Sequence, residues 1–207
     1  MLSDMRLKDF LDELASSSPA PGGGSVAALS GSLSAALSSM VCRLTIKKKK
    51  YEDVRDEIRL ILTKCELLRD RLTELIDEDT AAFNEVMDAF KMPKDNDEQR
   101  EERKRRIQLA LKNATHSPLK IVQLCYDLLN LNLVIAEKGN VSSITDTGVS
   151  TLLANTGIKS AALNVRINLS GVKEKEFIEK TEKELKEVEE NAEELTNKIM
   201  KIVKAKM

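Results

Sequence analysis

A long uncharged segment rich in glycine, alanine and serine restricts the fold of this chain more than any other feature. No residue from 16 to 42 is charged, although 32% of the whole chain is Asp, Glu, Lys or Arg. Prolines and the three glycines Gly22–Gly24 open the segment, and small residues follow. The pattern predicts a helix over 25–42 with Ser25 as its N-cap. Because its side chains are small, other helices or a second subunit can pack very close to it.

A second segment, residues 144–168, has the same character. Its only charged residues are Asp146, Lys159 and Arg166, and glycines and alanines recur along it. Two helices without charge or bulk are best accommodated at the centre of a bundle. We therefore expect 25–42 and 144–168 to form an inner helix pair, with charged helices packed outside.

The remaining predicted helices are strongly amphipathic. Apolar residues recur every three or four positions along each of them, which is the spacing of helices packed side by side. Aromatic residues make up 3% of the chain and Trp is absent, while Lys and Glu are abundant. We predict an all-α bundle forming a single domain over 1–207, with long amphipathic outer helices. Pro118 is expected to kink or split the 97–137 helix. The predicted outer helices are 3–15, 51–90, 97–137 and 173–205.

Composition excludes several classes of function. The formal net charge is -1, so no overall positive field favours nucleic acid. Three scattered cysteines without a CxxC motif and a single histidine argue against a disulfide framework and a metal site. The 25–42 segment contains six serines and falls short of the ~20 apolar residues of a membrane span. The N-terminus also lacks a signal-peptide core. We expect a cytoplasmic protein that contacts neither nucleic acid nor membrane.

Two aspartates occupy unusual positions. Asp79 interrupts the apolar stripe of the 51–90 helix. It lies either at a solvated margin where the stripe drifts, or inward as an acid that lines a site, since burying an unpaired carboxylate is costly. Asp146 follows Ser143 with the spacing of a capping box, although Glu or Gln is usual at that position. It serves either as a helix cap or as an acid or base at the mouth of the inner pair.

Three further features allow both a structural and a functional interpretation. The glycine loop before the 25–42 helix either packs tightly or presents free N–H groups to an anion, although it has no phosphate-loop motif. The run Lys47–Lys50 is either a solvated helix end or a site that captures an anionic substrate tail. His116, beside Pro118, is interpreted as structural. From the residues alone, the chain is a helical protein with two acids in unusual places.

Several motifs together resemble a known family, the cyclodeaminase/cyclohydrolase family of folate enzymes. The resemblance covers most of the chain in the right order, and the motifs are specific only in combination. This chain departs from the family pattern in having Lys47 where Gly is usual and Thr145 where Ser is usual, and neither change removes a functional group. The motifs are Pro-Ala-Pro-Gly-Gly-Gly-Ser-Val-Ala-Ala (19–28), Leu-Thr-Ile-Lys-Lys-Lys-Lys-Tyr (44–51), Asp-Glu-Asp-Thr-Ala-Ala-Phe (77–83), Met-Pro-Lys (92–94), Gly-Asn (139–140), Thr-Asp (145–146) and Asn-Val-Arg-Ile-Asn (164–168).

The resemblance implies an all-α homodimer without a metal or a tightly bound cofactor, acting on a tetrahydrofolate derivative that can carry a polyglutamate tail. The implied reaction is conversion of 5-formiminotetrahydrofolate to 5,10-methenyltetrahydrofolate and ammonia, with hydrolysis of the methenyl compound as the alternative on the same site. A dimeric helical scaffold without activity is a further alternative, and a nucleotide or phosphate binder is the weakest. The expected site residues are the catalytic Asp146 and Asp79 and the substrate-binding Gly22, Gly23, Gly24, Ser25, Lys48, Lys49, Lys50 and Asn140.

Overall fold

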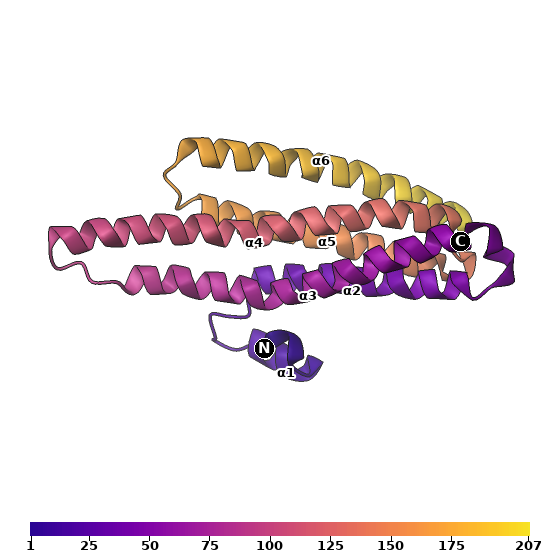
Figure 1. Ribbon diagram of the computed structural model, residues 1–207, viewed down its shortest axis with the longest axis horizontal. Coiled ribbons are helices and arrows are strands. Elements are labelled where there is room, and N and C mark those ends of the chain that lie inside the picture. The colour runs from indigo at the N-terminus through magenta and orange to yellow at the C-terminus, as the bar shows by residue number, and fades with distance from the viewer.

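A computed structural model describes all 207 residues of the chain as helices and short connections, without a β-strand. The long helices lie side by side as an elongated bundle, from which α1 stands apart on one side (Figure 1). This confirms the predicted all-α fold. The elements are η1 (Leu2–Asp4), α1 (Leu7–Leu14), α2 (Gly23–Ile46), η2 (Lys49–Val54), α3 (Arg55–Lys91), α4 (Asp97–Lys138), η3 (Val141–Ser143), α5 (Ile144–Leu169) and α6 (Lys175–Lys206).

The small-residue helices α2 and α5 form the predicted inner pair and pack against each other, against α4, and against α3 or α6. Gly31 and Gly157 allow this approach: a Cβ would lie 2.7 Å from the Cys125 sulfur at Gly31 and 2.8 Å from it at Gly157. Both distances are too short for a real contact, so the helices could not come as close with alanine at these positions. The charged helices α3, α4 and α6 bury their apolar stripes against this pair.

A buried polar network fixes the register of α2, α4 and α5. The Ser38 hydroxyl donates to the Asn132 side-chain oxygen over 2.6 Å, and the Asn132 amide donates to the Ser150 hydroxyl over 2.9 Å. Ser34 donates to the backbone carbonyl of Ser150 over 2.7 Å. All four side chains are fully buried and hydrogen-bonded, so a shift of one helix along another would leave buried polar groups unpaired.

Helix α4 runs unbroken through Pro118, so of the two outcomes predicted for this proline, a kink or a split, the split does not occur. A proline lacks the N–H that would bond the carbonyl four residues earlier, here that of Ala114. The side-chain amide of Asn168, on α5, donates to that carbonyl over 2.8 Å. A neighbouring helix therefore satisfies the carbonyl that the proline leaves free, and the helix continues.

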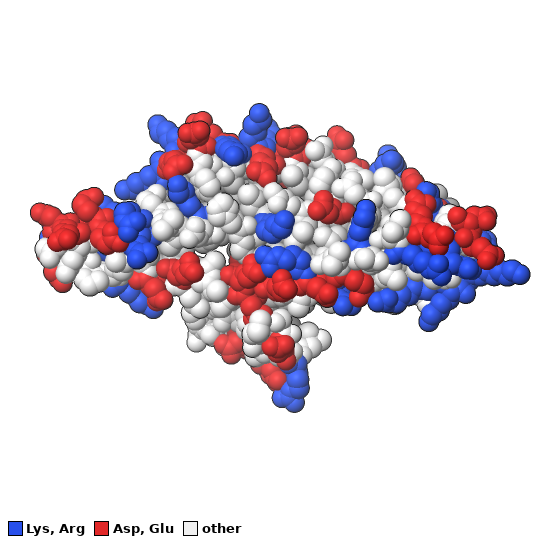
Figure 2. Space-filling view, in the orientation of Figure 1, with Lys and Arg blue, Asp and Glu red and all other residues white.

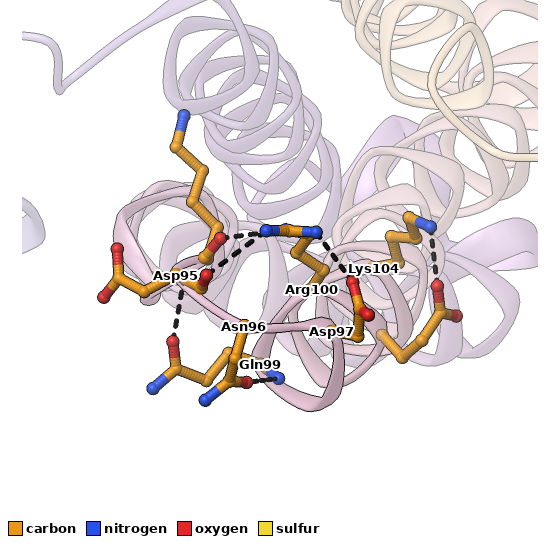
Figure 3. A network of polar contacts seen from close by, with 8 residues as sticks. Asp95, Asn96, Asp97, Gln99, Arg100 and Lys104 are labelled. Carbon is orange, nitrogen blue, oxygen red and sulfur yellow. Dashed lines mark hydrogen bonds and ion pairs between the residues drawn. The ribbon is translucent and has the colours of Figure 1, made fainter.

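The start of α4 is fixed by local polar contacts in the loop after α3 (Figure 3). Asn96 is the N-cap, and its side chain accepts the backbone N–H of Gln99 over 2.9 Å. The Gln99 side chain in turn accepts the backbone N–H of Asp95, the residue before the N-cap, over 2.9 Å. Arg100 donates to Asp97 over 2.7 Å and to two loop carbonyls. These contacts define where the long α3–α4 hairpin turns.

Charges of both signs alternate over the face of the molecule that Figure 2 shows, without a field of a single sign. By length and composition alone, α2 and α4 could each cross a membrane. However, 61% of the most apolar part of α2 and 50% of that of α4 are buried inside the bundle. The core of a helical bundle produces the same signal, so this observation is weak support for a membrane span.

Candidate active site

The glycine loop and Asp79 lie together at one end of α2. They line a cleft of about 440 Å³ between the loop and helices α3, α4 and α5. Of the two positions that the sequence analysis left open for Asp79, the structure shows the inward one, because α3 presents it to the first turn of α2. The cleft residues are Pro19, Ala20, Gly22, Gly23, Gly24, Asp79, Thr80, Ala82, Phe83, Val86, Met87, Phe90, Leu111, Ala114, Asn164, Ile167 and Asn168.

Ser25 links α2 to α3. The prediction that Ser25 is the N-cap of α2 is wrong. The helix begins two residues earlier, at Gly23, with Gly22 in the cap position and without a side-chain cap. The Ser25 hydroxyl lies 3.0 Å from the Ile76 carbonyl and 3.4 Å from Asp79 Oδ2, and it can donate to either. It is fully buried, so these contacts take the place of the capping bond.

The carboxylate of Asp79 occupies the N-terminus of α2, where the sequence analysis had placed a substrate anion. A Cβ at Gly24 would overlap this carboxylate, so only glycine allows the close approach. The N–H groups of the first turn thus face a carboxylate that belongs to the protein. A second anion at this point would be repelled by the first, so the glycine loop is better described as a wall of the cleft than as an anion site.

The environment of Asp79 changes its acidity. Burial raises the pKa of its carboxyl group, because the charged form loses solvation, while hydrogen bonds from the Ser25 hydroxyl and backbone amide partly offset this effect. Asp79 therefore holds a proton more readily than an exposed aspartate does. A partly buried carboxyl with a raised pKa in an open cleft is suited to general acid–base chemistry.

Two asparagines of α5 complete the polar part of the cleft and were not among the predicted site residues. Asn164 lies against Gly23, and its side-chain amide donates to the Ser160 carbonyl over 2.9 Å. Asn168 bonds the Ala114 carbonyl, as described above. The signal that could have identified them is their spacing, since residues four apart share one face of a helix. Their amides offer the donors and acceptors that a polar heterocycle requires.

One wall of the cleft is apolar and was also missed. Phe83, Met87 and Phe90 are spaced by four and three residues on α3, outside the stripe that packs into the bundle. Each leaves more than a third of its surface exposed. Exposed aromatic residues beside a polar cleft provide a surface on which a flat ring system can stack.

The lysine run and Asn140 form a second cluster at the other end of α2. Lys48 donates to the Asn140 side-chain oxygen over 2.9 Å, and the Asn140 backbone N–H donates to Thr45 Oγ1 over 2.9 Å. The Tyr51 hydroxyl accepts the backbone N–H of Val141 over 3.0 Å. These bonds attach the turn before α5 to the end of α2. Lys49 and Lys50 extend into solvent, and neither forms an ion pair.

Asp146 belongs to this second cluster by position, on the first turn of α5. Of the two roles left open for Asp146, the capping box does not form, because Ser143 occupies the N-cap position but makes no side-chain capping bond. Asp146 is partly buried and forms neither a hydrogen bond nor an ion pair within the chain. Its carboxylate is therefore free to act on another molecule.

Within one chain the two clusters are far apart. Helix α2 separates Gly24 from Thr45 by 21 residues, which corresponds to about 30 Å at the helical rise per residue. Asp79 and the glycine loop lie at one end, while Lys48, Lys49, Lys50, Asn140 and Asp146 lie at the other. The sequence analysis had assigned all of these residues to one site, and a single chain does not bring them together.

His116 faces a different cavity, of about 600 Å³, between α3 and α4. Its ring meets Phe177 edge-on with 6.1 Å between centroids, which agrees with the structural role predicted for it. The three cysteines are free and buried. The chain contains no group of three or more His, Cys, Asp or Glu side chains arranged to hold a metal ion.

The fold and the cleft are those of a small all-α enzyme domain with a carboxyl group at a stacking surface. The model of the formiminotransferase-cyclodeaminase family matches residues 6–187, and the chain belongs to that family. A methenyltetrahydrofolate cyclohydrolase of Methylorubrum extorquens is 45% identical over 207 residues, which is the full length of both chains.

The likeness extends to a longer protein and to a solved structure. The formimidoyltransferase-cyclodeaminase of Mus musculus is 35% identical over 180 residues, which cover 87% of this chain but 33% of the mouse protein. The crystal structure of a formiminotetrahydrofolate cyclodeaminase from Thermotoga maritima superimposes with a TM-score of 0.89 at 31% identity. That match covers 99% of this chain and 98% of the Thermotoga chain.

Proposed function

We propose that this chain is a methenyltetrahydrofolate cyclohydrolase. The observation that carries the proposal is the cleft beside Asp79, which places a carboxyl group of raised pKa beside asparagine amides and an aromatic wall. The amides and aromatic rings suit the binding of a pterin ring, and the carboxyl group suits proton transfer at the one-carbon unit attached to that ring. The end-to-end likeness to a cyclohydrolase at 45% identity favours hydrolysis over the other folate reaction of the family. The sequence analysis had ranked these two reactions in the opposite order.

The reaction requires three proton transfers around one carbon. Water adds to the methenyl carbon between N5 and N10 and loses a proton, which forms a tetrahedral centre that carries a hydroxyl group. The bond from that carbon to N5 then breaks as N5 takes up a proton and the hydroxyl group releases its proton to form the formyl carbonyl, so 10-formyltetrahydrofolate and one net proton are released. A positioned carboxyl group can accept the proton of the attacking water and donate it to N5, which contributes roughly 10²–10⁴-fold to the rate. Asp79 and Asp146 are the candidates for this role, and no cofactor is required.

The cleft suggests an orientation for the folate. The pterin would stack on Phe83 and Phe90, with its ring nitrogens and amino group toward Asn164 and Asn168. The p-aminobenzoyl-glutamate portion would then extend outward, away from Asp79, which would repel its carboxylates. Lys49 and Lys50 of the same chain lie about 30 Å from this cleft, so only those of another subunit would be placed to bind these carboxylates or a polyglutamate tail.

Cyclodeamination is the second candidate, and the close structural match to a formiminotetrahydrofolate cyclodeaminase favours it. In that reaction N10 attacks the formimino carbon on N5, ammonia leaves, and the methenyl bridge forms. The same carboxyl groups would protonate the departing nitrogen and accept the proton from N10. Both reactions pass through a tetrahedral centre at the same carbon, so one site can serve either.

An absorbance assay of the methenyl bridge separates these possibilities. With 5,10-methenyltetrahydrofolate, we expect the signal to fall faster than in the enzyme-free blank. With 5-formiminotetrahydrofolate, a rising signal with ammonia release would instead identify a cyclodeaminase. No change with either substrate, at saturating concentrations of folded protein, would contradict the proposal and favour a scaffold without activity.

A further inference from the structure

The cleft beside Asp79 contains a single ionisable side chain. Of the 17 residues that line it, Asp79 alone can carry a charge, and the others are glycines, apolar residues, one threonine and two asparagines. In the whole chain, by contrast, 32% of the residues are Asp, Glu, Lys or Arg. The charge of the cleft is therefore the charge of one carboxylate.

This carboxylate has no cationic partner in the chain. Its neighbours on α2 are Gly24, whose Cβ position it overlaps, and Ser25, whose hydroxyl lies 3.4 Å from Oδ2. Helix α4 contributes only apolar residues to the cleft, and α5 contributes two asparagines and an isoleucine. Glu78, the preceding residue on α3, pairs with Arg71 outside the cleft over 2.9 Å. Because an unpaired and partly buried carboxylate is costly, this arrangement favours a ligand that supplies the missing positive charge.

The proposed substrate carries such a charge. In 5,10-methenyltetrahydrofolate, one positive charge is shared between N5 and N10 across the methenyl carbon, so the bridge is an amidinium cation. Addition of water with loss of a proton removes this charge, and 10-formyltetrahydrofolate is neutral at both nitrogens. Substrate and product therefore differ by one unit of charge at the reacting carbon.

We propose that Asp79 is the counter-ion of the methenyl bridge, and that the cleft selects folates by the charge of their one-carbon unit. This inference rests on the proposed function for the identity of the ligand. The cation binds beside the ionised carboxylate, whereas a neutral one-carbon unit leaves that carboxylate without a partner. The product is consequently held less tightly than the substrate, which favours its release.

The charge of the substrate also explains how one carboxyl group serves first as a base and then as an acid. A cation in contact with Asp79 lowers the pKa of its carboxyl group, which keeps the side chain ionised and able to accept the proton of the attacking water. Once water has added, the cation is gone, and burial again raises the pKa of the carboxyl group. The proton then stays on Asp79 until N5 takes it.

A comparison of two folates tests the proposal through binding alone. The 5,10-methenyl and 5-formyl derivatives of tetrahydrofolate share the pterin and the glutamate tail, but only the first has a charged one-carbon unit. The absorbance of the methenyl compound, read in the first milliseconds after rapid mixing, gives its Kd before hydrolysis, and competition gives the Kd of the 5-formyl compound. In the wild-type chain at pH 7, we expect the cation to bind about 10- to 100-fold more tightly.

The variant Asp79→Asn keeps the size of the side chain and removes its charge. It should weaken binding of the methenyl compound by about 10- to 100-fold and change that of the 5-formyl compound by less than about twofold. Asp88→Asn is the matched control, because it removes the same charge from an exposed position on the same helix. It should leave both Kd values unchanged.

Two results would overturn the proposal. Equal weakening of both folates by Asp79→Asn would mean that the side chain binds the pterin or supports the cleft, and does not pair with the charged bridge. Equal binding of the two folates by the wild-type chain would also overturn it, and this comparison does not depend on the folding of a variant. Turnover in the methenyl assay decides the proposed function separately. Hydrolysis of the methenyl compound without any preference for it in binding would contradict the counter-ion role and leave the cyclohydrolase in place.

Discussion

At residue scale, the partly buried Asp79 is suited to acid–base chemistry but lowers the stability of the fold at neutral pH. Because burial raises its pKa, the folded state binds this proton more tightly than the unfolded state does. Linkage then makes the contribution of Asp79 to stability fall as the pH rises from about 4, the usual carboxyl value, through the raised pKa. At neutral pH the charged side chain is therefore a cost to the fold.

The variant Asp79→Asn tests this conflict. We expect it to raise the melting temperature at pH 7, with a gain that shrinks toward pH 4, and to reduce turnover by roughly 10²-fold or more. Thermal unfolding across this pH range, with Asp88→Asn on the exposed side of the same helix as control, measures the first effect. A variant that is less stable than the wild-type chain at pH 7 would contradict the account.

Gly24 should be intolerant of any side chain. A Cβ there would overlap the Asp79 carboxylate and force α2 and α3 apart. We expect Gly24→Ala to cost about 1–3 kcal/mol of stability and to lower kcat/KM strongly. Gly22→Ala is the matched control, because nothing lies within 4 Å of its Cβ position. Equal activity of the two variants would show that close packing at Gly24 does not position Asp79.

At the scale of elements, the Pro118–Asn168 contact explains how α4 stays continuous. Removal of the Asn168 amide leaves the Ala114 carbonyl unpaired, so Asn168→Ala should cost about 1–3 kcal/mol. In a Pro118→Ala background the helix supplies its own N–H, and the same change should cost less. A double-mutant cycle by urea unfolding measures the difference. Additive effects would mean that the amide does not compensate for the proline.

The helices themselves were predictable from the sequence, while the contacts between them were not. The spacing of apolar residues along α3 and α6 predicts amphipathic helices, and the absence of charge along most of α2 predicts a buried one. That Asp79 faces the first turn of α2 depends on the point at which α3 crosses it, which no local pattern specifies. The prediction of Ser25 as an N-cap was wrong for the same reason, because its hydroxyl donates to a carbonyl of the neighbouring helix α3.

At the scale of the whole molecule, the family motifs assign to one site residues that lie about 30 Å apart in the chain. A helical bundle of this length has two ends, and sequence analysis cannot assign a residue to one of them. The homodimer that the family resemblance implies would resolve the conflict if its two chains ran in opposite directions, with Asp79 of one chain near Asp146 of the other. Activity should then fall on dilution below the dimer dissociation constant.

The most direct test of this account is a mixing experiment with two variants. Asp79→Asn and Asp146→Asn should each form a dimer with little cyclohydrolase activity. After subunit exchange, half of the dimers contain one chain of each kind and one intact site, so an equal mixture should regain about a quarter of wild-type activity. Exchange is verified by pull-down through a tag on one variant. If the exchanged mixture remains as inactive as its components, the two acids do not act across the dimer.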